Sequence, residues 1–186
     1  MTVAEEEDDE EAQEDVPSRG EPNFHWLTEG LAVGGAFARE DATHLAATHG
    51  IRAVVDLRAE DRDDEEALRA SGIELLHLPT PDLHPASPEH LEQGVAFVRE
   101  RLARGEKVLI HCQHGIGRSA LLALCVLVDI GFEPLDALRH AKDRREIVSP
   151  SRSQYDGWCG WLEGRGLEAP DYHSFGCIAY RQAAQG

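Results

Sequence analysis

The chain has 186 residues, of which 18 are basic and 35 are acidic, so its formal net charge at neutral pH is −17. This length suits one well-buried domain, and the acidity argues against a nucleic-acid partner, because nucleic-acid-binding proteins carry a basic face. No run approaches the roughly 18 consecutive apolar residues of a membrane helix, and the first residues lack the basic and then apolar pattern of a secretory signal. We therefore expect a cytoplasmic protein with no membrane partner.

The negative charge is concentrated at the N-terminus. Residues 1–21 hold ten of the 35 acids and one base, Arg19, which leaves 25 acids and 17 bases, a net charge of −8, in the remainder. A segment with so many charges and so few aliphatic side chains cannot offset the entropy that it loses on ordering. We predict that residues 1–22 form a disordered acidic tail.

Strand and helix patterns alternate along the rest of the chain. Compact apolar runs rich in β-branched residues predict strands at 24–30, 31–35, 51–57, 73–78 and 107–112. Apolar residues at helical spacing, with capping residues at the ends, predict helices at 39–50, 59–72, 87–105, 116–131, 133–145 and 151–164. The acidic run over 60–66 is interpreted as the solvated start of the second of these helices. The alternation indicates an α/β fold with a central, mainly parallel or mixed sheet flanked by helices.

Domain boundaries follow from where these patterns begin and end. We assign residues 23–164 to the folded domain and residues 165–186 to a C-terminal extension. Periodicity is weak beyond Gly166, so the extension either docks as a short helix or trails free.

The four cysteines are widely spread, and none belongs to a CxxC pair; they are Cys112, Cys125, Cys159 and Cys177. This spacing predicts reduced thiols with no zinc knuckle and no disulfide framework. Cys125 falls in an apolar helix and is interpreted as a core residue. Asp56 and Arg58, at the end of a predicted strand, are interpreted as a structural ion pair, with Arg58 at the mouth of a site as the alternative.

Residues 111–119 read HCQHGIGRS and carry the strongest chemical signal. A buried strand ends at Cys112 and a helix begins near Ile116, so the loop between them directs its backbone N–H groups and the positive end of the helix toward one point. Gly115 and Gly117 let the loop wrap tightly around an oxyanion, and Arg118 can bind two of its oxygens at once. The same field predicts a pKa of the Cys112 thiol well below that of a free cysteine.

This stretch resembles the HCxxGxxR[ST] signature of the cysteine-dependent protein tyrosine phosphatases, and residues 23–164 are similar to a compact dual-specificity phosphatase in their order of elements. The resemblance implies attack of Cys112 on phosphorus, a phosphocysteine intermediate and hydrolysis by water, with no metal and no cofactor. It makes Arg118 the phosphate clamp and Ser119 the hydroxyl that eases departure of the thiolate, while His111 supports the loop and lowers the thiol pKa. The phosphate-binding residues would be Gln113, His114, Gly115, Ile116, Gly117 and Arg118.

The reaction also requires a proton donor for the leaving oxygen. Asp82 lies in the proline-rich stretch PTPDLHPAS, directly after a predicted strand, at a place similar to that of the acid loop in small dual-specificity phosphatases. A simple turn role for Asp82 and proton donation by His84 are the alternatives. The stretch SPSRSQY resembles the QTxxQY of classical tyrosine phosphatases, with Pro150 in place of the first glutamine. It makes Gln154 a candidate for positioning the water, against a plain surface role.

The loop side chains also bear on the substrate. Only His114 among the side chains of the loop could become cationic, whereas members of the superfamily that act on polyphosphoinositides usually carry lysines there. The resemblance therefore implies phosphotyrosine and phosphoserine or phosphothreonine in proteins as substrates. A small phosphate ester, such as a phosphoinositide, nucleotide or sugar phosphate, is one alternative, and a rhodanese-like sulfurtransferase is another. The pattern specifies neither the physiological substrate nor the oligomeric state.

Overall fold

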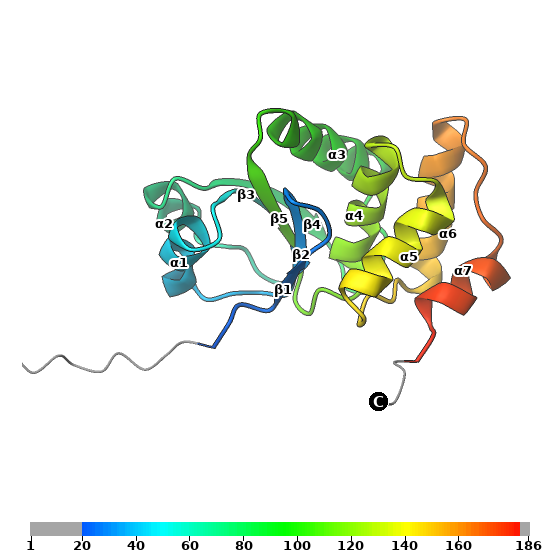
Figure 1. The fold of residues 1–186 in the computed structure, drawn as a ribbon, viewed down its shortest axis with the longest axis horizontal. Coiled ribbons are helices and arrows are strands. Elements are labelled where there is room, and N and C mark those ends of the chain that lie inside the picture. The colour runs from blue at the N-terminus through cyan, green and yellow to red at the C-terminus, as the bar shows by residue number, and fades with distance from the viewer. Residues whose placement is uncertain (1–19, 183–186) are drawn as a thin grey trace, which may run out of the picture.

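The computed structural model describes residues 20–182, which fold around one five-stranded sheet (Figure 1). The predicted acidic tail over 1–22 lies, except for its last three residues, outside the described residues. Across the sheet the order is β1-β2-β5-β3-β4, in which β1 is antiparallel to β2 and every other pair is parallel. The mixed sheet confirms the predicted fold class. The strands are β1 (Phe24–Trp26), β2 (Leu31–Gly34), β3 (Ile51–Arg58), β4 (Glu74–Thr80) and β5 (Lys107–His111).

Helices cover both faces of the sheet (Figure 1). One face carries α1 (Ala42–Ala47), which follows a 3-10 turn at Arg39–Asp41, and α2 (Glu65–Ala70). The other face carries α3 (Pro88–Ala103), α4 (Arg118–Asp129), α5 (Pro134–Arg144), α6 (Arg152–Gly164) and α7 (Tyr172–Ala179). Within residues 20–182, no helix combines the length and the apolar character needed to cross a membrane.

Alternation along the strands divides the buried side chains between two cores. In β5, Val108 and Ile110 join the large core beneath α3 and α4, whereas Leu109 between them joins the smaller core beneath α1 and α2. In β3, Val55 and Val54 separate in the same way. Successive side chains of a strand point to opposite faces, so a continuous apolar run is the pattern of a strand covered on both sides.

Helix α4 is the centre of the large core. Every residue from Arg118 to Val128 is buried, and α4 packs against α3, α5 and α6 as well as against the sheet. This burial explains why the sequence is apolar on all sides here, and it includes Cys125, whose exposed fraction is 0%. The helix begins at Arg118, two residues later than predicted.

The acidic helix predicted over 59–72 is shorter than expected. Helix α2 begins at Glu65, because the side chain of Asp64 caps it by accepting the N–H of Ala67 at 2.8 Å. The preceding acidic residues form a loop held by Asp56, whose carboxylate accepts the N–H of Asp63 at 3.0 Å. The interpretation of 60–66 as a solvated helix start is therefore confirmed for Asp64, Glu65 and Glu66 but was wrong for residues 60–63, which form a loop that leads toward the site described below.

The C-terminal extension docks on the large core through α7. The ring of Phe175 is fully buried there. The ammonium of Lys142, itself buried, donates to the carbonyl of Ala179 at 2.8 Å and to that of Val148 at 2.9 Å. The hydroxyl of Tyr180 donates to the carbonyl of Pro150 at 2.7 Å. The extension therefore fixes the segment between α5 and α6 from outside.

This packing predicts the cost of loosening α7. We expect Phe175→Ala to lower the free energy of unfolding by about 3–5 kcal/mol, the usual range for emptying a buried aromatic site. Leu167→Ala, in the same extension but 40% exposed, should change it by no more than about 0.5 kcal/mol. Urea unfolding followed by circular dichroism measures both, and equal effects would show that α7 is not part of the core.

Candidate active site

The loop between β5 and α4 has the shape of an anion cradle. Gly115 adopts φ +69°, a left-handed conformation that favours glycine. A Cβ at this position would lie 2.5 Å from the backbone of Gly34, so the close approach also requires glycine. Because β5 is parallel to its neighbours, the loop lies at the same edge of the sheet as the ends of β3 and β4.

Cys112 lies at the base of this loop with an exposed fraction of 3%. Its sulfur is 3.3 Å from the hydroxyl oxygen of Ser119. Burial raises the pKa of the Cys112 thiol, but the hydrogen bonds from the hydroxyl and N–H of Ser119 and from the N–H of Gly115, with the charge of Arg118, lower the pKa below its ordinary value overall. The sulfur is therefore held in place by the loop, in surroundings that favour the thiolate.

Arg118 is buried and held by its outer edge. Its Nη1 and Nη2 donate to the two carboxylate oxygens of Glu60, each at 2.7 Å, and Nη1 also donates to the carbonyl of Thr80 at 2.9 Å. Nε is buried and has no hydrogen-bond partner among the described residues. The guanidinium is thus fixed in orientation, and two of its five N–H groups, that of Nε and the second of Nη2, are left for an oxyanion.

Glu60 is a functional residue that the sequence analysis missed. Its hydrogen bonds to Arg118 lower the pKa of the Glu60 carboxyl to about 2, so the pair stays charged. The signal available in the sequence was indirect: a buried arginine requires a counter-charge, and the acidic run follows β3, which neighbours β5 in the sheet.

His111 supports the loop from beneath. Its Nε2 is 2.6 Å from Asp63 and its Nδ1 is 3.1 Å from the carbonyl oxygen of Cys112. Burial lowers the pKa of His111, but the bond to Asp63 and the charges of Asp63 and Asp56 raise it overall. Arg58 is bound to both of these carboxylates, which confirms its interpretation as a member of a structural ion pair.

Asp82 lies beside the guanidinium, in the loop that follows β4. Its Oδ1 is 3.5 Å from Nε of Arg118, and its side chain is 67% exposed. The next residue, Leu83, has φ +64°, and its N–H donates to Oδ1 of Asp82 at 2.9 Å. Nδ1 of His84 is 2.8 Å from the carbonyl oxygen of Asp82. The structure thus brings Asp82 to the phosphate loop, while this nitrogen of His84 contacts backbone.

Gln154 joins the acid loop to α6 and is not a surface residue. Its exposed fraction is 1%, its Nε2 donates to the carbonyl of His84 at 3.2 Å, and its Oε1 accepts the N–H of Ser151 at 2.8 Å. A Cβ on Gly117 would lie 2.4 Å from Oε1 of Gln154, so the amide also lies against the phosphate loop.

Arg145 braces the phosphate loop from behind and was not identified from the sequence. With an exposed fraction of 1%, it donates to the carbonyls of Gly115 and His114 at 2.9 and 3.0 Å and to the side-chain oxygen of Asn23 at 3.0 Å. Burial lowers the pKa of Arg145, and the negative charge of Cys112 partly opposes this. Nothing in its local sequence distinguishes it from the other arginines nearby.

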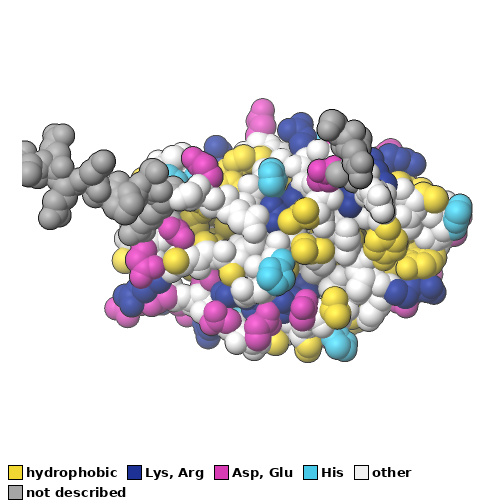
Figure 2. Space-filling view, turned by 90° about the horizontal axis from the view of Figure 1, so that it is seen from below, with side chains coloured by type: hydrophobic (Ala, Val, Ile, Leu, Met, Phe, Trp, Pro, Cys, Tyr) yellow, Lys and Arg dark blue, Asp and Glu magenta, His cyan; other side chains and the backbone are white. Residues whose placement is uncertain are grey.

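The mouth of the site carries side chains of several kinds. Gln113, His114 and Ile116 of the loop are exposed. Figure 2 looks onto this side of the molecule, where basic, acidic and hydrophobic side chains are intermixed. A substrate therefore meets a mixed surface around one buried guanidinium.

The family model for the dual specificity phosphatase catalytic domain matches residues 37–159, a range that includes Glu60, Asp82, Cys112, Arg118, Arg145 and Gln154. The chain belongs to the dual-specificity phosphatase family. Human dual specificity protein phosphatase 12 is 28% identical over 134 residues, which cover 69% of this chain and 37% of that protein. Human dual specificity protein phosphatase 5 is 30% identical over 65% of this chain and 31% of its own length. The chain thus spans about a third of the curated relatives that it matches.

Solved structures agree with this family and fold. The active form of Tk-PTP is 27% identical, with a TM-score of 0.70 over 76% of this chain and 97% of that one. PTPMT1 in complex with PI(5)P is 21% identical, with a TM-score of 0.71 over 77% and 99% of the two chains. The latter comparison supports the dual-specificity phosphatase fold alone.

The environment of Cys112 predicts its reactivity toward alkylation. Because the thiolate reacts and its pKa is lowered, we expect iodoacetamide to modify Cys112 at pH 7 and more slowly as the pH falls. Ser119→Ala removes a hydrogen bond of about 1.4 kcal/mol to the thiolate. It should therefore shift the midpoint of the alkylation rate against pH upward by about one pH unit. Mass spectrometry of the modified peptide measures the rate. A midpoint near pH ~8.5, the pKa of a free thiol, in the unsubstituted protein would contradict this account.

The pair between Glu60 and Arg118 predicts a pH-dependent contribution to stability. Since the pKa of Glu60 is about 2 in the folded chain, its contribution is present above its ordinary pKa and is lost as the pH falls toward 2. Glu60 is half exposed, so we expect Glu60→Gln to cost only about 1 kcal/mol at pH 7, and less at pH 3. Urea unfolding at both pH values tests this, with the exposed Glu66→Gln as a neutral control. An equal deficit at both would argue against the pair.

Proposed function

We propose that this dual-specificity phosphatase hydrolyses phosphate monoesters through a phosphocysteine intermediate, without a metal, and that its substrates are phosphotyrosine and phosphoserine or phosphothreonine in proteins. The observation that carries the proposal is the position of the Cys112 sulfur at the base of the cradle, together with the Nε of Arg118, which makes no hydrogen bond to a described residue, and the carboxylate of Asp82 3.5 Å from that Nε. A nucleophile, an oxyanion donor and an acid thus converge on one point.

In the first step, the phosphate of the substrate binds to the N–H groups of the loop and to Arg118. The Cys112 thiolate attacks phosphorus in line as the bond to the ester oxygen breaks, and protonated Asp82 gives its proton to that oxygen. The negative charge on the equatorial oxygens is stabilised by donors that are already oriented, because Glu60 and Thr80 hold the guanidinium in place.

In the second step, Asp82 accepts a proton from water and the resulting oxygen nucleophile attacks the phosphocysteine. The S–P bond breaks, inorganic phosphate leaves, and the hydroxyl of Ser119, 3.3 Å from the sulfur, stabilises the returning thiolate. Gln154 acts here by holding the acid loop against the phosphate loop, since its amide bonds join His84 to α6. The role proposed for Gln154 is therefore to position the loop that carries Asp82, through the hydrogen bonds of its buried amide.

The preference for protein substrates is supported by the rim of the site. Ile116 in the loop and Leu83 beside the acid are 38% and 66% exposed, and such apolar side chains suit an aromatic ring or a peptide. PTPMT1 has been solved with PI(5)P, but in this chain only His114 of the loop residues can offer positive charge to further phosphates. A phosphoinositide is therefore the second substrate class to be tested.

We also propose a cytoplasmic location, in keeping with the state of the thiols. All four cysteines are free, and reduced thiols are typical of the cytoplasm. A reducing environment would also keep a cysteine of lowered pKa in its reduced form, because the thiolate is the form that oxidises.

Hydrolysis of para-nitrophenyl phosphate tests the catalytic assignment. We expect activity in the presence of a metal chelator, inhibition by orthovanadate, and loss of at least about 10⁴-fold in kcat for Cys112→Ser, because the nucleophile is removed. Asp82→Ala should lower kcat by about 10²–10³-fold, the usual contribution of a general acid. Cys177→Ser, which changes an exposed cysteine, should retain full activity. Activity that survives in Cys112→Ser would refute the mechanism.

Substrate class is decided by comparing phosphotyrosine and phosphothreonine peptides with PI(5)P in vesicles, and thiosulfate with cyanide as acceptor. We expect the highest kcat/KM with the phosphopeptides. A higher value with PI(5)P would replace the proposed substrate class, and thiocyanate formation without phosphate release would replace the reaction by sulfur transfer.

A further inference from the structure

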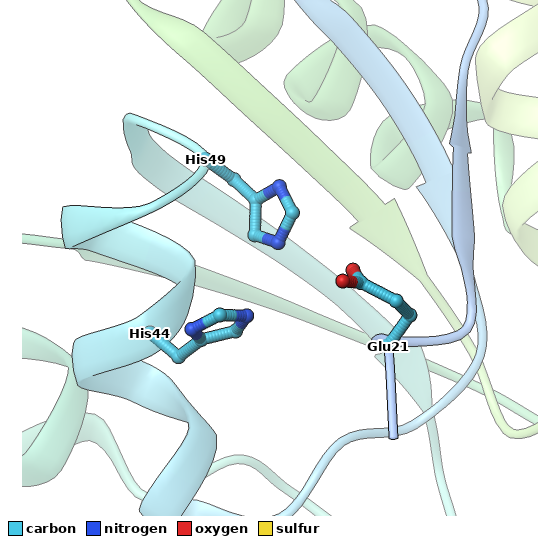
Figure 3. A group of neighbouring side chains, drawn as sticks. All are labelled: Glu21, His44 and His49. Atoms are coloured by element: carbon cyan, nitrogen blue, oxygen red, sulfur yellow. The ribbon is translucent and has the colours of Figure 1, made fainter. Parts of the chain in front are cut away.

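We propose that Glu21, His44 and His49 form a zinc-binding site that joins the segment before β1 to the end of α1. The three side chains come from two parts of the chain, the segment before β1 and α1 with the turn after it, and they face one another (Figure 3). One ligand atom from each lies within 4.8 Å of the other two. The site has no residue in common with the phosphate loop or its supporting network.

The orientation of the three groups suits a shared cation. Figure 3 shows the carboxylate of Glu21 directed between the two imidazole rings, each of which turns a nitrogen toward it. The rings of His44 and His49 are nearly perpendicular, at 87°, with centroids 5.0 Å apart. A tetrahedral zinc ion with ligands at about 2 Å needs ligand atoms roughly 3.4 Å apart, so small rotations of these side chains complete the geometry.

The second observation is a buried nitrogen without a partner. Nε2 of His49 is inaccessible to solvent and has no hydrogen bond with any described residue. Burial of an unpaired polar atom is unfavourable. The ring of His49 is also held in place by an edge contact with Phe24, at 4.9 Å between centroids. A zinc ion would supply the missing partner of this nitrogen.

His44 is prepared as a ligand by its neighbour. Its Nδ1 is 3.0 Å from the hydroxyl oxygen of Thr48. When Nδ1 carries the proton and donates it to Thr48, Nε2 presents its lone pair, which is the arrangement by which outer-shell partners orient metal-bound histidines. Both histidines can therefore ligate through Nε2.

The donor set indicates the class of ion. Two imidazole nitrogens and one carboxylate suit Zn²⁺, with a water as the fourth ligand, whereas Mg²⁺ and Ca²⁺ prefer oxygen ligands throughout. The carboxylate of Glu21 supplies negative charge to the site. This charge counters the positive charge of Lys107, whose electrostatic effect also reaches His49. The ammonium of Lys107 lies over the ring of Trp26, 5.2 Å from its centroid.

Zinc at this position would brace the N-terminal part of the fold. Glu21 lies two residues before Asn23, whose side chain accepts a hydrogen bond from Arg145. Within residues 20–182, β1 is an edge strand of three residues that pairs only with β2, so a metal link to α1 would add a restraint that its backbone pairing does not supply. The inferred role is structural and does not depend on the proposed phosphatase activity.

Zinc binding to the full-length Cys112→Ser protein tests the site, because this variant removes the nucleophilic thiolate as a competing ligand. Isothermal titration with Zn²⁺ should show one equivalent bound, and Co²⁺ should give the visible absorption of a tetrahedral complex. In the Cys112→Ser background, a further His49→Gln or His44→Gln substitution should weaken the affinity for Zn²⁺ at least 100-fold and abolish the Co²⁺ absorption. Glu21→Gln, a change at an exposed residue, should weaken it about tenfold. Circular dichroism without metal shows whether each variant is folded.

The matched control is His173→Gln. Nε2 of His173 lies 3.7 Å from the sulfur of Cys177 on α7, and this exposed histidine and cysteine could bind zinc in place of the proposed site. It should leave both the affinity and the spectrum unchanged. Zn²⁺ should also raise the Tm of the Cys112→Ser protein, by linkage between binding and folding, and should not do so with His49→Gln. Absence of binding, or binding that is lost in His173→Gln and kept in the three site variants, would overturn the proposal.

Discussion

The buried charge of Arg118 is the constraint around which the site is built. A guanidinium with an exposed fraction of 2% is unfavourable unless its donors are satisfied. Glu60 and the carbonyl of Thr80 satisfy the outer edge, while the inner Nε has no hydrogen bond in the described part of the chain and faces the carboxylate of Asp82 at 3.5 Å. The arrangement therefore reserves the remaining N–H groups of the guanidinium for an anion and fixes their direction in advance.

The sheet explains how the participating groups meet. The ends of three parallel strands, β3, β4 and β5, lie side by side, and the loops that leave them carry Glu60, Asp82 and Cys112. Backbone geometry alone brings these two carboxylates and the cysteine to the same edge. The second layer of support comes from the helical side, where Arg145 and Gln154 contact the phosphate loop and the acid loop.

The features that could be predicted from the sequence are those whose interactions join residues close together along the chain. The phosphate loop is local, so strand, glycines, arginine and serine revealed it within nine residues, and Asp82 followed from its place after a strand. Glu60 was misassigned because an acidic run is also the ordinary start of a helix, and only its tertiary contact with Arg118 separates the two cases. Arg145 depends wholly on long-range packing against Gly115, His114 and Asn23, which no local pattern encodes.

The bonds of Lys142 bear on how the protein can be shortened. Its buried ammonium donates hydrogen bonds to the carbonyl of Ala179 at the end of α7 and to the carbonyl of Val148. The N–H of the adjoining Ser149 donates to the carbonyl of Ile116 in the phosphate loop. A truncated protein that stops at residue 159, where the family match ends, would leave this ammonium one acceptor short beside the loop. Boundaries for expression or fusion should therefore be placed after α7, beyond the point that homology alone would suggest.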